Sequence, residues 1–258
     1  MAAPPTIAKP DTVELWFVDL NTSSAALDAV ERQTPRLAAS ELKKISASAS
    51  VKAAAERRTA YIALRVLIER FWGPDWRTTP YTLAGSGKPT IKGLGGSFSL
   101  AHVDRYALIG LARTGTIGVD LEPDRQPTVS DERRLRIENA AIALAQGAAL
   151  PLPRQMRFLQ AWVRLEAVAK ADGRGIGRLL TGLGVIGADP ASGPGFIESY
   201  ARDVSARFWV QDVQVGEGCV AAIALDGQVP SLQPPLKLPS TVAEIDALLM
   251  AATTTASH

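Results

Sequence analysis

The chain has 258 residues, of which 47% are hydrophobic and 21% are charged, a balance typical of a protein that buries a substantial core. Its formal net charge of +2 is too small to indicate a nucleic-acid partner, although it leaves room for a local basic patch. A single cysteine, Cys219, excludes an internal disulfide and a cysteine-based zinc site, and its apolar surroundings predict a buried thiol.

The N-terminal residues MAAPPTIAKP lack the basic segment and the apolar stretch of a signal peptide. No apolar run approaches the roughly 18 residues that cross a bilayer. We therefore expect a cytoplasmic protein that does not associate with a membrane. The length fits one large domain or two small ones.

Hydrophobic periodicity predicts helices and hairpins in a repeated order along the chain. In the first part we expect a strand over 13–20, helices over 24–33, 40–45 and 51–72, a loop over 85–89 and a hairpin over 97–112. In the second part we expect a strand over 116–122, helices over 133–147 and 156–173, a hairpin over 206–227 and a terminal helix over 240–251.

Both parts follow one pattern, in which a helix precedes a hairpin whose second strand is small and apolar. These second strands read RYALIGLA and GCVAAIAL. The pattern predicts an α+β fold built from two similar α/β halves, residues 1–115 and 116–258, with a cleft between them. The stretches 147–154 and 228–239 have the composition of linkers.

Two carboxylates stand out in TIGVDLEPDR, where Asp120 and Glu122 are two residues apart in a predicted strand. Residues i and i+2 of a strand share a face, so both carboxylates point the same way while Val119 and Leu121 face the core. Like charges side by side are unfavourable unless something compensates them. Two interpretations follow: a solvated strand end, or a magnesium site that combines one or two carboxylates with substrate phosphates.

A second pair lies in the helix FLQAWVRLEAVAK, where Glu166 and Lys170 are four residues apart beside the apolar stripe. An ordinary surface ion pair is one interpretation. The other is a functional pair, because the Gly-rich basic turn in ADGRGIGRLL follows it and is suited to the rim of a phosphate or partner site.

Further candidates are basic. Lys88 lies in GSGKP and is suited to gripping a phosphate, although this stretch is not a Walker A motif. His102 is either a structural histidine or a ligand contact. The first helical region carries a basic cluster that is either solvated surface or a docking site for an anion. That cluster comprises Lys43, Lys44, Arg57, Arg58 and Arg65.

Taken in order, the motifs GKP, F-x-x-x-H, GVDLE and W-x-x-x-E-A-x-x-K followed by G-x-G resemble those of the 4′-phosphopantetheinyl transferases. The resemblance runs from about Lys43 to Leu225. The two-half length is similar to that of the surfactin-synthetase-activating (Sfp-type) branch, and not to the short trimeric holo-acyl-carrier-protein synthases. It implies halves related by a pseudo-twofold, each a small antiparallel sheet packed on a long helix. Since one chain carries both sides of the cleft, we expect a monomer.

The resemblance implies a reaction in which a serine hydroxyl of an apo acyl or peptidyl carrier protein attacks the pantetheine-bearing phosphorus of coenzyme A, and 3′,5′-ADP leaves. Coenzyme A is then a co-substrate and Mg²⁺ the cofactor, with Mn²⁺ as a substitute. Asp120, Glu122 and Glu166 would hold the metal. Glu166 would also accept the serine proton, and Lys170 would contact the phosphates and stabilise the leaving group.

For coenzyme A the resemblance implies a set of contacts on both sides of the cleft. Lys88 and His102 would bind phosphates, and the two helical cations Lys43 and Arg58 would grip the 3′-phosphate. His102 would also join Glu166 and Lys170 as a catalytic residue. The full cofactor-binding set is Lys43, Arg58, Lys88, Ala101, His102 and Lys170.

The sequence departs from the family pattern in several places. Leu165 stands where a lysine often precedes the glutamate, Ala101 replaces a serine, and Val103-Asp104 replaces a Ser-Gly pair. The Phe-Ser/Thr-x-x-Glu segment usually credited with carrier-protein docking is not visible in 123–150. Two other functions therefore stay open: a non-catalytic module that binds coenzyme A or a carrier protein, and another magnesium-dependent phosphotransferase.

Overall fold

The computed structural model describes residues 13–83, 88–126, 128–144, 156–187, 194–216, 218–227 and 232–255. The helices are α1 (Leu20–Gln33), α2 (Ala39–Ser46), α3 (Val51–Trp72), the 3₁₀ helix η1 (Pro74–Trp76), α4 (Asp131–Leu144), α5 (Arg157–Asp172), α6 (Ile176–Gly182), α7 (Pro194–Arg207) and α8 (Val242–Thr255). The strands are β1 (Val13–Asp19), β2 (Thr82–Leu83), β3 (Pro89–Thr90), β4 (Ser97–Val103), β5 (Tyr106–Ala112), β6 (Ile117–Pro123), β7 (Phe208–Val213), β8 (Cys219–Asp226) and β9 (Leu236–Lys237).

Two main sheets organise the protein. The first has the strand order β4-β5-β1-β9 and the second has the order β6-β8-β7, beside a small β2-β3 ribbon. All neighbours pair antiparallel except β1 and β9, which run parallel. The hairpins predicted over 97–112 and 206–227 are confirmed as β4-β5 and β7-β8. The structure is therefore mixed α/β, and a pseudo-twofold relation between its halves stays a prediction.

The two small, apolar strands that the sequence singled out occupy interior places in these sheets. Strand β5 lies between β4 and β1, and β8 lies between β6 and β7. All residues of β5 except Tyr106 are buried, as are all residues of β8 except Cys219 and Asp226. Burial on both faces explains their composition, because every side chain then packs against another layer.

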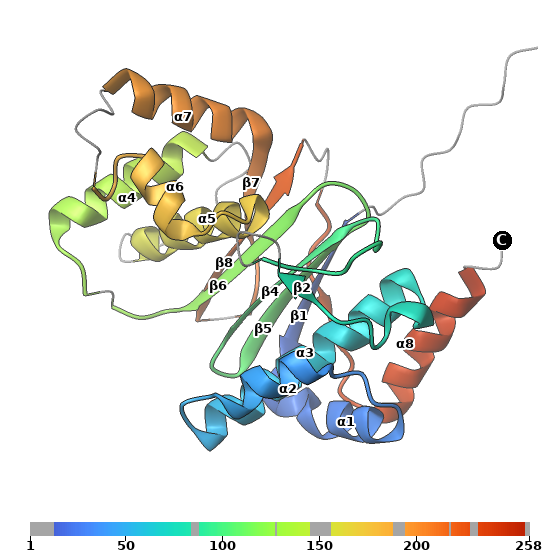
Figure 1. Ribbon diagram of the computed structural model, residues 1–258. Helices are drawn as coiled ribbons and strands as arrows, with labels where there is room; N and C mark the ends of the chain where they lie inside the picture. The colour runs from blue at the N-terminus through green and yellow to red at the C-terminus, as the bar shows by residue number, and fades with distance from the viewer. Residues whose placement is uncertain are drawn as a thin grey trace, which may run out of the picture.

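Helices cover the outer face of each sheet, and the inner faces pack on each other. Figure 1 shows α1, α2, α3 and α8 on one side of the sheets and α4 to α7 on the other. Three cores follow from this order: one under α1, α3 and α8, one under α4 to α7, and one between the sheets. The core between the sheets includes Leu15, Leu108, Val119, Leu121 and Ile223.

Local signals set the ends of the two long helices. Helix α3 begins after Ser50, whose hydroxyl accepts a hydrogen bond from the Ala53 amide at 3.1 Å. Helix α5 ends at Gly173, which has a φ of 77° and donates its amide to the Ala169 carbonyl. A left-handed residue at this position stops the helix beside the second sheet.

The last part of the chain returns to the first sheet. Strand β9 pairs with β1, so that Leu236 lies opposite Trp16. Helix α8 follows, and its buried Ile245 belongs to the core under α1 and α3. The residues that the sequence assigned to the end of the second half thus complete the core of the first, while the boundary near residue 115 stays a prediction.

Two serine hydroxyls join the sheets where β4 runs beside β6. Ser97 Oγ accepts a hydrogen bond from the Ile117 amide, and Ser99 Oγ accepts one from the Val119 amide, both at 3.0 Å. These side chains satisfy amides that no neighbouring strand pairs with on that edge of β6. They fix the strand that carries Asp120 and Glu122 relative to the first half.

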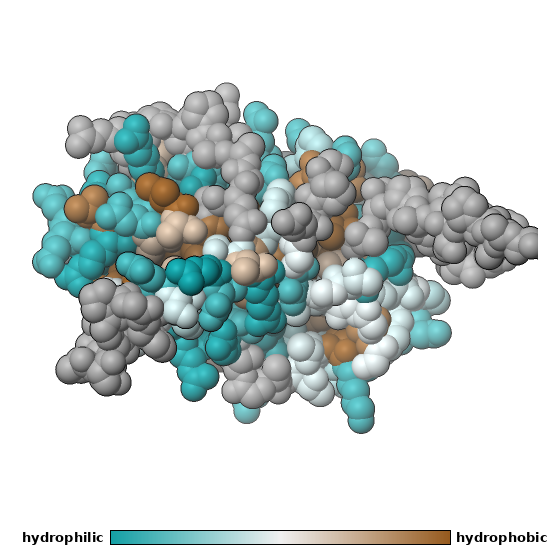
Figure 2. Space-filling view, turned by 90° about the horizontal axis from the view of Figure 1, so that it is seen from above, coloured by the Kyte–Doolittle hydropathy of each residue, from teal (hydrophilic) through white to brown (hydrophobic). Residues whose placement is uncertain are grey.

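The described residues on the face shown in Figure 2 are mainly hydrophilic. On the face shown in Figure 2, brown hydrophobic areas are small and separate among the teal ones. Over the described residues, the exposed large hydrophobic side chains are scattered across several elements, which is ordinary for a protein surface. None of the described helices is both long and apolar enough to cross a bilayer.

Candidate functional site

A cavity of about 630 Å³ lies between the two halves. Helices α2 and α3 and strand β4 form one wall, and the end of α5 with the start of α6 forms the other. This size lies within the roughly 300–1,000 Å³ common for small-molecule sites. The predicted cleft between the halves is therefore present.

Of the three candidate carboxylates, Glu166 lines this cavity, and the close contact between β6 and α5 places Asp120 beside the cavity-lining Lys170. At Gly118, a Cβ atom would lie 2.0 Å from the Ala167 carbonyl oxygen and 2.5 Å from the Ala171 amide nitrogen. Only a residue without a side chain lets the strand approach the helix so closely. The approach brings Asp120, two residues further along β6, against Lys170 on α5.

Asp120 and Glu122 share one face of β6, as predicted, with Val119 and Leu121 in the core on the other face. Asp120 is buried, and the Lys170 ammonium donates a hydrogen bond to its Oδ1 at 2.6 Å. Glu122 is more open and pairs with Arg125 at 3.2 Å. Each carboxylate of the strand thus has a cation of the chain beside it.

Glu166 is a partly buried carboxylate one turn before Lys170. Within the described part of the chain, it has no hydrogen bond or ion pair. Burial raises its pKa, the negative charges of Asp120 and Glu122 raise it further, and Lys170 opposes them. Burial also raises the pKa of Asp120, against the effect of Lys170. The three carboxylates are therefore electrostatically coupled and incompletely compensated.

Carboxylate oxygens are ligands of the kind that a hard divalent cation prefers. In the arrangement seen here, the described residues contain no group of three acidic, histidine or cysteine side chains at metal-binding spacing. Mg²⁺ does not require one, since it commonly takes one or two carboxylates together with phosphate oxygens and water. A divalent cation would also offset the excess negative charge that raises the pKa of Glu166.

The cavity wall itself is basic. Lys44, Arg57, Lys88, His102 and Lys170 line it, and of its two acidic residues Glu41 is neutralised by the buried Arg65 at 2.7 Å. Burial lowers the pKa of His102, and the charges of Arg57 and Lys170 lower it further. A neutral histidine among cations is the expected result where positive charge is in excess. The cavity is thus suited to a polyanionic ligand.

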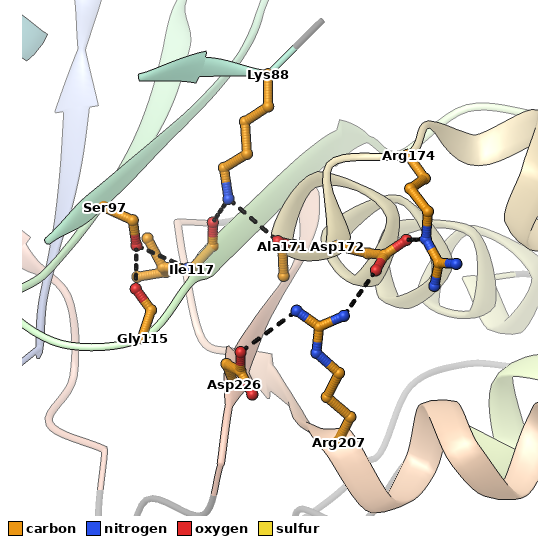
Figure 3. Close-up of polar contacts among 9 residues, drawn as sticks. All are labelled: Lys88, Ser97, Gly115, Ile117, Ala171, Asp172, Arg174, Arg207 and Asp226. Atoms are coloured by element: carbon orange, nitrogen blue, oxygen red, sulfur yellow. Dashed lines mark hydrogen bonds and ion pairs between the residues drawn. The ribbon is translucent and has the colours of Figure 1, made fainter. Parts of the chain in front are cut away.

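Lys88 lies at the wall but points its ammonium at the backbone of the second half. It donates hydrogen bonds to the carbonyl oxygens of Ile117 at 2.9 Å and Ala171 at 3.2 Å (Figure 3). Burial lowers its pKa to about 8. The preceding residues 84–87 lie outside the described residues, so the predicted loop is seen only from Lys88 onward.

Three residues of the implied cofactor-binding set do not line the cavity. Arg58 pairs with Asp28 of α1 at 3.0 Å, and Ala101 is buried in the core between the sheets. Lys43 is exposed beside the cavity-lining Lys44. His102, Lys88 and Lys170 do line it.

The neighbouring cations Lys44 and Arg57 take these places at the wall. Arg57 donates hydrogen bonds to the Lys44 carbonyl at 3.1 Å and to Ser48 Oγ at 3.0 Å, which ties α3 to α2. Both residues belong to the basic cluster found in the sequence. In each helix two consecutive residues are basic, and the rotation of the helix about its axis decides which of the two faces the cavity. That rotation depends on packing that the sequence pattern does not reveal.

One other expectation changes with the structure, and one cation near Glu166 has a partner elsewhere. Cys219 is only partly buried, because it lies at the start of β8, and burial together with the charge of Asp104 raises its pKa. Arg164 forms a buried bidentate pair with Asp212 of β7, with both distances 2.7 Å. It therefore does not supply the positive charge that is missing next to Glu166 at Leu165.

Comparison with known proteins adds one relative. No family model matches the chain. A protein of Synechocystis sp. with the provisional name 4′-phosphopantetheinyl transferase is 31% identical over 125 residues, which is 46% of this chain and 49% of that protein. This similarity supports the 4′-phosphopantetheinyl transferase family. The match spans about half the length of both proteins and does not distinguish the branches of the family.

Proposed function

We propose that this protein transfers the 4′-phosphopantetheine group of coenzyme A to a serine of an apo acyl or peptidyl carrier protein, with Mg²⁺ or Mn²⁺, and releases 3′,5′-ADP. The observation that carries the proposal is the group of carboxylates on β6 and α5, in which Glu166 lines a basic cavity between the halves and Asp120 pairs with the cavity-lining Lys170. The similarity to the Synechocystis sp. protein supports the same reaction class.

The basic wall accounts for binding of the nucleotide end. Coenzyme A carries three phosphate groups, and Lys44, Arg57 and Lys170 present cations that compensate them. His102, which burial and these cations keep neutral, offers a hydrogen bond without adding charge. Lys88 would contribute by holding the two walls at their spacing and not as a free phosphate ligand.

In transfer, the serine Oγ forms a bond to the pantetheine-bearing phosphorus, and the bond from this phosphorus to the bridging pyrophosphate oxygen breaks. Glu166 accepts the serine proton, directly or through water. Lys170 offsets the charge that develops on the departing 3′,5′-ADP. Asp120, Glu122 and Glu166 would hold the divalent cation, which supplies charge neutralisation at the phosphates.

The finer assignments belong to the same proposal. We assign the chain to the Sfp-type branch, as a cytoplasmic monomer with halves related by a pseudo-twofold. The support is that each sheet has its own helical cover and that a single chain provides both cavity walls.

The test is the intact mass of an apo carrier protein after incubation with this protein, coenzyme A and Mg²⁺, with and without EDTA. We expect an EDTA-sensitive gain of roughly 340 Da, the mass of one phosphopantetheine group. Glu166→Gln should abolish the gain and retain the fold. No gain across acyl and peptidyl carriers would overturn the proposal. Retained coenzyme A binding would then favour a non-catalytic binding module, and its loss another magnesium-dependent phosphotransferase.

A further inference from the structure

We infer that Lys170 is an internal counter-ion that occupies Asp120 in the ligand-free protein and weakens the binding of a divalent cation there until an anion in the cavity draws it away. This inference rests on the proposed function and adds an order of events to it. Lys170 then has two alternative partners, the Asp120 carboxylate and an anion in the cavity.

The first partner is Asp120. The Lys170 ammonium lies 2.6 Å from Asp120 Oδ1, and the Asp120 side chain is only 9% exposed. A carboxylate buried to this extent needs a cation or several donors to stay charged. In the described residues, Lys170 is the cation hydrogen-bonded to it.

The second partner lies in the cavity. Lys170 also lines the cavity, with its side chain 32% exposed, near the basic residues Arg57 and His102. A phosphate placed there would offer the ammonium a new anionic partner within the reach of its flexible four-carbon side chain. The ammonium can thus exchange a carboxylate for a phosphate while α5 stays in place.

The two cations compete for one carboxylate. An ammonium hydrogen-bonded to Asp120 repels a divalent cation and takes an oxygen that the metal would use as a ligand. This competition also agrees with the lack of a ready-made three-ligand cluster in the described part of the chain. Removing the ammonium, or attracting it to a phosphate, should therefore raise the affinity of the site for the metal.

The consequence is reciprocal coupling. If an anion in the cavity increases the metal affinity, then the metal increases the affinity for the anion by the same factor. Anion and metal would bind together much more readily than either alone. The metal site would bind its cation more weakly while the cavity is empty.

Glu122 and Arg125 provide a matched control. Their pair has a separation of 3.2 Å, but the Arg125 side chain is 52% exposed, so water screens it. Arg125→Gln removes a cation next to a proposed ligand without unmasking a buried carboxylate. Lys170→Arg is a second control, because it keeps a cation beside Asp120.

The experiment measures Mn²⁺ binding to the ligand-free protein by calorimetry and by electron paramagnetic resonance of free Mn²⁺. We expect Lys170→Met to bind Mn²⁺ roughly tenfold more tightly than the wild type, within the usual range of coupling between sites. Arg125→Gln should change the affinity by no more than about twofold. Lys170→Arg should stay close to the wild type, and Asp120→Asn introduced into Lys170→Met should abolish the gain.

A second measurement adds an anion to the wild type and to Lys170→Met. Saturation with 3′,5′-ADP should tighten Mn²⁺ binding roughly tenfold in the wild type and clearly less in Lys170→Met. The inference would be overturned if folded Lys170→Met bound Mn²⁺ no more tightly than the wild type or did not bind it detectably. It would also be overturned if 3′,5′-ADP tightened Mn²⁺ binding equally in both proteins. If the wild type modifies carrier proteins but Lys170→Met does not bind Mn²⁺ more tightly, this inference alone is rejected. If Lys170→Met binds Mn²⁺ more tightly but the wild type modifies no carrier protein, the transferase function alone is rejected.

Discussion

The Lys88 ammonium lies 3.2 Å from the carbonyl oxygen of Ala171, so that a residue of the first half occupies one of the open carbonyls at the end of helix α5. Its second bond, to the Ile117 carbonyl, reaches the start of β6. Figure 3 shows that Asp172, held by Arg174 and Arg207, lies next to this contact. One partly buried ammonium thus ties together the strand and the helix that carry the candidate carboxylates.

This contact predicts a pH-dependent stability. Burial lowers the pKa of Lys88 to about 8 against the effect of Asp172, and Arg207 lowers it further. Because the unfolded chain holds this proton up to roughly pH 10.4, it binds more protons than the folded chain between these values. The Lys88 contribution to the free energy of unfolding should therefore rise with pH in that window.

The measurement is urea denaturation of the wild type and Lys88→Met from pH 7.5 to 10. The wild-type free energy of unfolding should rise relative to the variant by up to about 1.4 kcal/mol per pH unit. Lys52→Met is measured beside it as a control for the loss of a lysine, because the Lys52 side chain is 80% exposed. A Lys88 difference that is flat or falls with pH would show that the ammonium is not buried as described.

The close approach at Gly118 gives a second prediction. A Cβ atom there would overlap the backbone of α5, so Gly118→Ala must separate β6 from the helix. We expect a loss of about 1–3 kcal/mol in the free energy of unfolding and a large loss of carrier modification. Gly177→Ala in α6 is the control, since a Cβ at Gly177 meets no atom within 4 Å. Its stability should stay the same or rise by up to about 1 kcal/mol. Equal effects of both substitutions would argue against the close approach.

Much of the fold could be predicted from local patterns. The helix predicted over 51–72 is confirmed residue for residue, because its apolar spacing and terminal Ser50 and Gly73 are local signals. Helix α1 begins at Leu20, four residues before the prediction, since the Asp19 side chain accepts hydrogen bonds from the Asn21 and Thr22 amides. The return of β9 and α8 to the first sheet left no local signal, because long-range pairing determines it.

The candidate site divides in the same way. Strand alternation placed Asp120 and Glu122 on one face without any knowledge of the fold. Helical spacing likewise predicted that Glu166 and Lys170 lie close together. The choice of Arg57 over Arg58 depends on Asp28 of α1, which binds Arg58 on the other side of the helix. The hydrogen bonds of Lys88 could not be predicted in this way, because their acceptors, the carbonyls of Ile117 and Ala171, lie 29 and 83 residues further along the chain.

The buried ion pair behind the basic wall predicts a strong effect on stability. Arg65 is fully buried and donates to Glu41 at 2.7 Å, while its guanidinium lies 3.9 Å from the Tyr81 ring. Arg65→Met would leave the Glu41 carboxylate buried without its cation, at a cost of about 3–5 kcal/mol. Arg136→Met removes an exposed pair with Glu132 at 2.6 Å and should cost less than about 1 kcal/mol. Chemical denaturation of both variants tests the difference, and similar losses would contradict the burial of the Arg65 pair.

The neutral state of His102 can be tested directly. Burial lowers its pKa, and Arg57 and Lys170 lower it further by opposing another positive charge in the cavity. The chain contains only two histidines, so His102→Gln assigns the imidazole signals in a nuclear magnetic resonance titration. We expect the wild-type pKa of His102 to lie below its ordinary value and Arg57→Gln to raise it, because one repelling charge is gone. Arg58→Gln should leave it unchanged, since Arg58 pairs with Asp28 away from the cavity wall. If Arg58→Gln raised the pKa as much as Arg57→Gln, the rotation of α3 described here would be wrong, and the 3′-phosphate contact would return to Arg58.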